Sequence, residues 1–155
     1  MLSRLPKVFA SLNSHDVKYV VIGGIAATLY GVPRMTFDLD ILVEASPENA
    51  QRLLDALLEA QMGTAALITP EELLNNAVTM FQDRVRIDVQ TSTPGIDFES
   101  AWQRRQTMTH QGEEFYVLSR DDLIASKRAA GRAIDLEDVR ILEEDAANEP
   151  PEEAD

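Results

Sequence analysis

The sequence predicts an α/β (α+β) fold with a mixed central sheet flanked by helices, and two observations support this prediction. Short apolar segments that are typical of strands alternate with longer segments whose apolar residues have helical spacing. Two pairs of strand-like segments are separated by very short turns, near Asp83 and at Gln111-Gly112, which indicates two hairpins. Hairpins combined with strand–helix–strand connections predict strands of both orientations.

The first part of the chain is expected to form helix, strand and helix in turn. Residues 2–14 have apolar side chains at helical spacing, and residues 18–24 form a short apolar strand that ends in two glycines. A second helix is expected over residues 24–31 and should stop at Gly31, because glycine readily ends helices.

The strand that follows has two different faces, because alternate side chains of a strand point to opposite sides of a sheet. Its apolar face is expected to pack on the core and carries Met35, Phe37, Leu39, Ile41 and Val43. Its polar face carries Arg34, Thr36, Asp38 and Asp40. Two carboxylates on one face repel each other unless a cation lies between them, so this strand is the first candidate for a functional site.

Capping signals predict where the later helices begin. Ser46 followed by Pro47 is typical of a helix start, and Thr69 and Glu72 have the spacing of a capping box. Three more helices are expected at residues 97–106, 119–131 and about 135–144.

Length and composition indicate one domain. We expect the 155 residues to form a single domain over 1–144, followed by a disordered acidic tail over 145–155. The net charge of −13 at pH 7 argues against a nucleic-acid binder without chemistry. The sequence has no apolar run long enough for a membrane span and no signal-peptide pattern, and it has no cysteine, so we expect a cytoplasmic protein without disulfides or membrane partners.

Three pieces of sequence together suggest chemistry. Gly23 and Gly24 lie between a strand and a helix, where the backbone can approach a ligand and the exposed N–H groups favour an anion. The pair Asp38 and Asp40 lies on the next strand, and Asp88 repeats this pattern on the polar face of a later strand. Three carboxylates on one sheet face would suit two Mg²⁺ ions during phosphoryl transfer. Alone, a Gly-Gly pair is often only a turn and an Asp-x-Asp pair is common by chance.

The combination "GGIAATLYGVPRMTFDLDILV" with the later "IDV" resembles the nucleotidyltransferase fold of the DNA polymerase β superfamily. The downstream segment "SRDDLIASKRAAGRAIDLEDVRIL" is similar to a second signature, found in minimal nucleotidyltransferases of the abortive-infection AbiEii type. Lys127, Arg132 and Asp135 match this second signature. The resemblance spans most of the chain, although the AbiEii-type toxins are longer.

The resemblance implies a reaction in which an acceptor hydroxyl attacks the α-phosphate of a nucleoside triphosphate and pyrophosphate leaves. It implies that Asp38, Asp40 and Asp88 hold Mg²⁺ in a two-metal site and that Asp88 helps to deprotonate the acceptor. The nucleotide-binding residues that we expect, with ATP among the nucleotides, are Gly23, Gly24, Arg34, Thr36, Lys127, Arg132 and Asp135.

The sequence leaves several alternatives open. Asp135 could instead be the N-cap of the last helix, and Lys127 with Arg128 could be a solvated helix face. Arg34 could touch the triphosphate or pair with a carboxylate. The acceptor could be tRNA, a partner protein or a small molecule, in a toxin–antitoxin or phage-defence system. The rival function is a silent nucleotide-binding antitoxin or partner module.

Overall fold

The computed structural model describes residues 4–148, with side chains described through residue 145. These residues form a six-stranded sheet in the order β3-β4-β2-β1-β6-β5. The strands are β1 (Tyr19–Ile22), β2 (Asp38–Val43), β3 (Val78–Gln82), β4 (Arg86–Gln90), β5 (Gln106–His110) and β6 (Glu113–Val117). The helices are α1 (Leu5–Ser14), α2 (Gly23–Leu29), α3 (Pro47–Glu59), the 3₁₀ helix η2 (Gly63–Leu67), α4 (Pro70–Leu74), α5 (Phe98–Arg104), α6 (Arg120–Ala130) and α7 (Ala133–Asn148).

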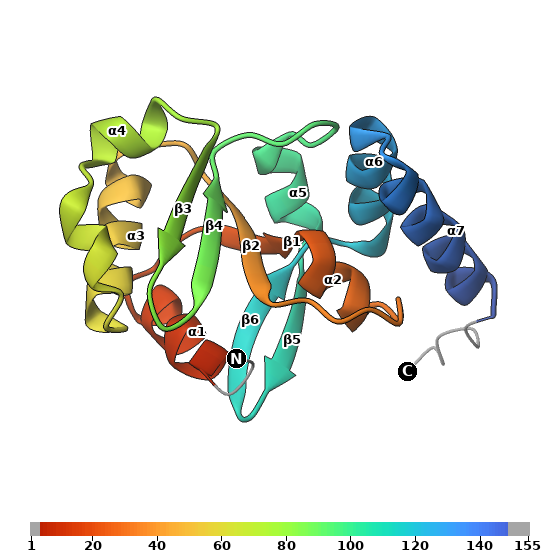
Figure 1. Cartoon of the computed structure of the whole chain (residues 1–155), viewed down its shortest axis with the longest axis horizontal. Helices are drawn as coiled ribbons and strands as arrows, with labels where there is room; N and C mark the ends of the chain where they lie inside the picture. The colour runs from red at the N-terminus through yellow and green to blue at the C-terminus, as the bar shows by residue number, and fades with distance from the viewer. Residues whose placement is uncertain (1–3, 149–155) are drawn as a thin grey trace.

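The sheet is mixed, as predicted. Strand β1 is antiparallel to β2 and parallel to β6, and β2 is parallel to β4. The two predicted hairpins are confirmed as the antiparallel pairs β3–β4 and β5–β6. Figure 1 shows α3 and α4 beyond one end of the sheet, whereas α6 and α7 lie together beyond the other end, with α2 on that side of β2.

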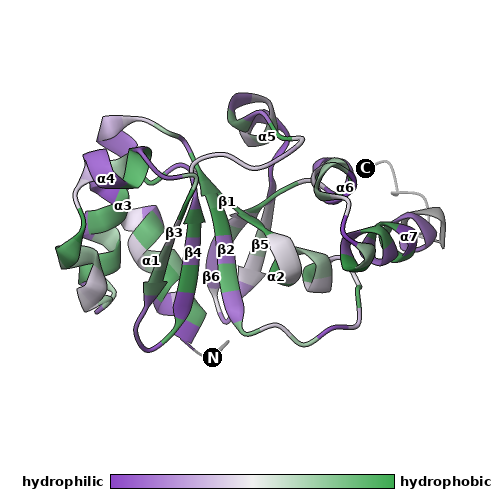
Figure 2. Cartoon of the chain, turned by 45° about the horizontal axis from the view of Figure 1, so that its top comes forward, coloured by the Kyte–Doolittle hydropathy of each residue, from purple (hydrophilic) through white to green (hydrophobic). Residues whose placement is uncertain are grey.

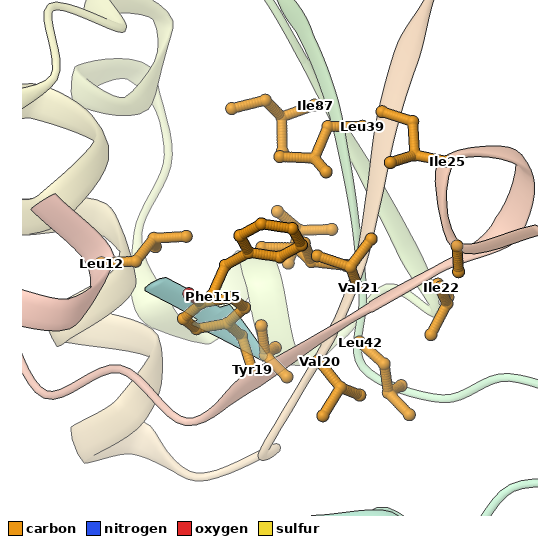
Figure 3. Packing of buried hydrophobic residues seen from close by; sticks show 14 of the residues in the cluster. Leu12, Tyr19, Val20, Val21, Ile22, Ile25, Leu39, Leu42, Ile87 and Phe115 are labelled. Carbon is orange, nitrogen blue, oxygen red and sulfur yellow. The ribbon is translucent and has the colours of Figure 1, made fainter. Parts of the chain in front are cut away.

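The core lies where α1 and α3 pack against the sheet. Phe9 of α1 stacks on Phe115 of β6 with ring centroids 4.5 Å apart, and Tyr19 of β1 is fully buried beside them (Figure 3). Leu39 of β2 and Ile87 of β4 are also fully buried in this cluster. In Figure 2 the N-terminal ends of β2 and β4 are hydrophilic, and polar residues alternate with buried apolar ones at Asp40 of β2 and at Asp88 and Gln90 of β4. The apolar face therefore builds the core and leaves a polar face of the same strands for the site.

Local capping chemistry produces the helix starts that the sequence predicts. Ser46 Oγ accepts a hydrogen bond from the backbone N–H of Asn49 at the start of α3. At the start of α4, Thr69 Oγ1 accepts a hydrogen bond from the backbone N–H of Glu72, as half of the predicted capping box, and the Thr69 hydroxyl donates to Glu72 Oε1. Gly131 ends α6 with a φ of +69°, a conformation that glycine adopts without strain.

The expectation that Met35 and Phe37 belong to the core is wrong. Strand β2 begins only at Asp38, and Met35 and Phe37 are 82% and 66% exposed. The reason is the pairing with β4, which begins at Arg86 opposite Asp38, so the residues before Asp38 have no partner strand beside them. The segment 33–37 therefore crosses from α2 to β2 as an irregular connection.

The last helix is longer than predicted at both ends. It begins at Ala133 and continues to Asn148, past the expected domain end at residue 144. Arg140 forms ion pairs with Glu137 and Glu144 along the exposed face of this helix, within the predicted range. Residues 149–155 of the predicted tail lie outside the described residues.

Within residues 4–148, no helix has both the length and the apolar character needed to cross a membrane.

Candidate active site

Strand register brings two of the three predicted aspartates together. In the parallel pair β2–β4, Asp40 lies opposite Asp88, and Asp38 lies opposite Arg86. The side chains of Asp40 and Asp88 thus point to the same face from neighbouring strands. This pairing joins residues 48 positions apart in the chain (88 − 40). In the same register, the residue beside Asp38 on β4 is the basic residue Arg86 and not Asp88.

Gly23 leaves the space that the carboxyl group of Asp40 occupies. Ile22 is the register partner of Asp40, so the backbone turns into α2 directly over this side chain. A Cβ on Gly23 would lie 2.4 Å from Asp40 Oδ2, and Gly23 also has a φ of +69°. Both observations require glycine at this position. Gly24 is less constrained, because a Cβ there would make an ordinary contact at 3.4 Å with Thr36.

The Asp40 carboxyl group holds a proton more tightly than an ordinary aspartate does. Burial, the charge of Asp88 and a hydrogen bond with Asp88 together raise its pKa to about 7, whereas the charge of Arg86 has a weaker opposing effect. The Arg86 guanidinium donates to both carboxylate oxygens of Asp88, at 3.2 and 3.3 Å. Arg86 therefore forms its ion pair with Asp88, and among the described residues no cation forms an ion pair with Asp40.

These carboxyl groups form one wall of a cavity of about 400 Å³. Strands β2 and β4 supply Asp40 and Asp88, and the start of α2 supplies Gly23 and Gly24. Helices α6 and α7 form the facing wall. A cavity of this size lies within the range of small-molecule sites in proteins.

The facing wall is a network of ion pairs centred on Asp138, a residue of α7 that is 1% exposed. Arg34 Nη2 lies 2.6 Å from Asp138 Oδ1, and Lys127 Nζ lies 2.9 Å from Asp138 Oδ2. Lys127 Nζ is also 3.7 Å from Asp135 Oδ1, and Arg132 Nε donates to Asp135 Oδ2 at 2.7 Å. Three cations and two carboxylates therefore leave this wall with one excess positive charge.

The network decides between the alternatives that the sequence left open. Lys127 is 7% exposed, so it does not belong to a solvated helix face. Asp135 is not an N-cap, because α7 begins at Ala133 and the Asp135 side chain pairs with Arg132 and Lys127. Arg34 pairs with a carboxylate, as one alternative held, but the carboxylate is Asp138 rather than an aspartate of β2.

Most of the predicted site residues line this one cavity: Gly23, Gly24, Arg34, Asp40, Asp88, Lys127, Arg132 and Asp135. Two predicted residues lie beside it and do not line it. The Asp38 side chain is 41% exposed and lies 3.7 Å from Arg86, and Thr36 Oγ1 donates to the backbone carbonyl of Asp38.

The sequence reasoning missed four polar residues that also line the cavity: Gln90, Thr93, Ser126 and Asp138. The sequence spacing of two of them could have identified them as site residues. Gln90 is two residues after Asp88 on the same strand face, and Asp138 is three residues after Asp135 on the same helix face. No local pattern marks Thr93 or Ser126.

The donor set of the sheet wall fits a divalent cation in part. Among the residues whose side chains are described, no group of three or more His, Cys, Asp or Glu residues is arranged to hold a metal ion. Asp40 and Asp88 nevertheless supply carboxylates at one register position, although Arg86 already donates to both oxygens of Asp88, and Mg²⁺ commonly binds to one or two carboxylates plus substrate phosphates. Both residues line the cavity, whereas the space beside Gly23 is taken by the Asp40 carboxyl group itself.

A mixed sheet with a Gly-Gly turn over paired strand aspartates defines the class of nucleotidyltransferase-like proteins. The chain belongs to the family described as "Nucleotidyltransferase of unknown function (DUF6036)", whose model matches residues 2–144. No curated protein matches the chain.

Two solved structures are similar in fold. One is an antigenic nucleotidyltransferase-like protein from Paracoccidioides brasiliensis, with a TM-score of 0.55, 18% identity, and coverage of 91% of this chain and 74% of that one. The other is a nucleotidyltransferase candidate from Thermotoga maritima, with a TM-score of 0.55, 16% identity, and coverage of 94% and 91%. At such identities the likeness shows the fold alone, which agrees with the predicted fold class.

Proposed function

We propose that the protein transfers a nucleoside monophosphate from a nucleoside triphosphate, ATP among them, to a hydroxyl acceptor with the help of Mg²⁺. One observation carries this proposal: β2–β4 register places Asp40 beside Asp88 under Gly23, across a cavity from Lys127, Arg34 and Arg132. Carboxylates on one wall and cations on the other suit a metal-bound polyphosphate, which carries both charges.

In this reaction the acceptor hydroxyl oxygen forms a bond to the α-phosphorus while the bond from that phosphorus to the bridging oxygen breaks. Pyrophosphate leaves with the electron pair, and the hydroxyl proton must be taken up. Asp88 is the group that would help to take it up, because a carboxylate beside the acceptor oxygen can accept its proton. Positioning and charge neutralisation would supply most of the remaining rate enhancement.

Asp40 and Asp88 would hold Mg²⁺, and bound Mg²⁺ would neutralise charge on the phosphates during transfer. Asp38 is the third expected ligand, and to bind the ion its carboxylate would have to give up its ion pair with Arg86. On the facing wall, Lys127 would contact phosphate as a point charge, and the guanidinium of Arg132, which is 74% exposed, is free to turn toward the nucleotide.

The finer assignment to the AbiEii-like type, within a toxin–antitoxin or phage-defence system, is also a proposal. The ion-pair network of Lys127, Arg132 and Asp135 supports it, because these are the residues that match the second signature. The acceptor would be tRNA, a partner protein or a small molecule.

The test is nucleotide transfer with each of the four α-labelled nucleoside triphosphates, Mg²⁺ and a cell extract that contains RNA and protein. We expect label to move to an acceptor with the wild type, and Asp40→Asn and Asp88→Asn to reduce this transfer at least a hundredfold. Asp55→Asn, on the exposed face of α3, is the matched control and should leave transfer unchanged. Transfer that survives in both active-site variants would contradict the proposal.

A second candidate function is the silent nucleotide-binding module. One observation favours it: Arg34, Lys127 and Arg132 are all already paired with carboxylates of α7, which leaves this wall with only one net positive charge. This function predicts that nucleotide stabilises the protein without release of pyrophosphate. Release of pyrophosphate that depends on Asp40 would exclude it.

A further inference from the structure

A second cavity lies beside the candidate active site and has a different character. Its volume is about 530 Å³, and it lies between α1, α2, the connection 33–37 and the β5–β6 hairpin. We call it the apolar groove. Apolar side chains form most of its wall, among them Leu5, Leu29, Met35, Phe37 and Phe115.

The connection 33–37 contributes the most exposed apolar side chains of this groove. Met35 and Phe37 are 82% and 66% exposed, and Leu29 of α2 is 40% exposed. The three lie in one short stretch of chain that leads directly into Asp38. Clustered exposed apolar residues of this size usually mark a binding site, because water contact with them is unfavourable.

The groove and the active-site cavity share a boundary. Arg34 lines both of them, because its backbone belongs to the connection while its guanidinium pairs with Asp138 on the far wall of the active site. Thr36 also lines the groove, and its side chain would contact a Cβ added to Gly24 at 3.4 Å. A molecule seated in the groove thus lies next to the residues that would hold the nucleotide.

The polar groups of the groove are few. Among the described residues that line it, Arg34 alone carries a permanent charge, and Asp138 already neutralises that charge. His110 lines the groove as well, and its Nε2 atom is buried without a hydrogen-bond partner among the described residues. A ligand with an uncharged and largely apolar body would therefore match this surface.

We propose that the apolar groove binds the body of the acceptor, and that the acceptor is a compound whose hydroxyl is carried by an uncharged aromatic or aliphatic body. This inference rests on the proposed transferase function and specifies its second substrate. A nucleic-acid acceptor fits less well, because it would need several unpaired cations along the groove to neutralise its phosphates.

The test is a titration of the full chain, labelled with ¹³C in its methionine methyl groups, against three probes. The probes are N-acetyl-L-tyrosinamide, N-acetyl-L-serinamide and a short RNA oligonucleotide with a free 3′ hydroxyl. We expect the tyrosinamide to shift the Met35 methyl signal saturably, and the serinamide and RNA to bind at least tenfold more weakly. No saturable shift with the tyrosinamide, or tighter binding of the serinamide or RNA, would overturn the inference.

Matched variants locate the binding. The double variant Met35→Gln/Phe37→Gln should weaken tyrosinamide binding at least tenfold, and it should fold normally because both side chains are exposed. Met80→Gln is the control, since Met80 is 55% exposed on β3 and does not line the groove. If Met80→Gln weakens binding as much as the double variant does, the groove is not the site.

The titration needs neither nucleotide nor transfer, so the two proposals can fail separately. Binding to the groove without any nucleotide transfer would refute the transferase and leave the apolar ligand site. Transfer whose acceptor KM is the same in wild type and in Met35→Gln/Phe37→Gln would refute the groove and leave the transferase. If both hold, the double variant raises the KM of the acceptor and leaves the KM of the nucleotide unchanged.

Discussion

The two walls of the active-site cavity contain carboxyl groups that behave in opposite ways. On the sheet wall, burial and the neighbouring Asp88 raise the pKa of Asp40 to about 7. On the helix wall, burial also raises the pKa of Asp135, but the hydrogen bonds and charge of Arg132 and the charge of Lys127 outweigh it, and the net shift is downward. Burial has the same sign on both walls, so the difference shows that the partner decides the charge state.

The partners differ because the two walls are built differently. Parallel pairing of β2 and β4 places residues of equal register side by side, and here it matches Asp40 with a second carboxylate. In the helix wall, Arg132 lies three residues before Asp135 at the start of α7, while Lys127 comes from the neighbouring helix α6. The carboxylates of the helix wall are therefore each paired with a cation, whereas Asp40 on the sheet wall has a second carboxylate as its neighbour.

The largest expected effect comes from breaking the helix wall. Lys127→Met leaves Asp138 and Asp135 buried with fewer cations, which should lower the free energy of unfolding by about 3–5 kcal/mol. Urea denaturation followed by circular dichroism measures this. Arg128→Met on the same helix is the control, because Arg128 forms an exposed pair with Glu143, and it should cost less than about 1 kcal/mol. An equal loss of unfolding free energy in both variants would mean that the buried Lys127 ion pairs stabilise the protein no more than the exposed Arg128 pair does.

An effect of intermediate size is expected where the sheet wall meets α2. Gly23→Ala adds a Cβ 2.4 Å from Asp40 Oδ2 at a φ of +69°, so it should lower the free energy of unfolding by about 2–3 kcal/mol and displace the Asp40 carboxyl group. Gly24→Ala should change stability by less than about 1 kcal/mol, since its Cβ has room beside Thr36. Urea denaturation of the two variants compares them, and similar losses would remove the special role of Gly23.

The smallest expected effect is a pH dependence of the sheet wall. The pKa of Asp40 is about 7 in the folded protein against 3.8 for an ordinary aspartate, so the folded state binds this proton more tightly. The resulting stability is fully present below about pH 3.8 and is lost as the pH rises through 7. Between pH 5 and 8 the wild type should lose about 1–2 kcal/mol relative to Asp40→Asn, since partial exposure weakens the full shift.

Urea denaturation of both proteins at pH 5 and 8 measures this pH dependence. Mg²⁺ should reduce the difference at pH 8, because a bound cation favours the ionised pair. A wild type whose stability follows that of Asp40→Asn at both pH values would show that the two carboxyl groups are not coupled.

Local signals in the sequence were enough to predict most elements. Ser46, Thr69 and Ser119 cap helices because their hydroxyls reach a backbone N–H only three residues away. The hairpins at Asp83 and Gln111-Gly112 likewise depend on neighbouring residues. Such interactions join residues only a few positions apart, so a local sequence pattern is enough to predict them.

The sequence by itself also determined which residue types the site would contain, because Gly23, Asp40, Asp88 and Lys127 stood in recognisable spacings. Only the tertiary structure decided how they combine. Register between β2 and β4 placed Asp88 beside Asp40 and gave Asp38 the basic neighbour Arg86.

The dependence on tertiary structure also explains two features that the sequence did not predict, the role of Asp138 and the exposure of segment 33–37. Asp138 became the centre of the helix wall only when α6, α7 and the connection that carries Arg34 packed together. Met35 and Phe37 continued an alternating strand pattern, yet β4 pairs with β2 only from Asp38 onward. Strand register and helix packing depend on contacts between distant segments, and a local pattern of side chains holds no record of where its partner strand stops.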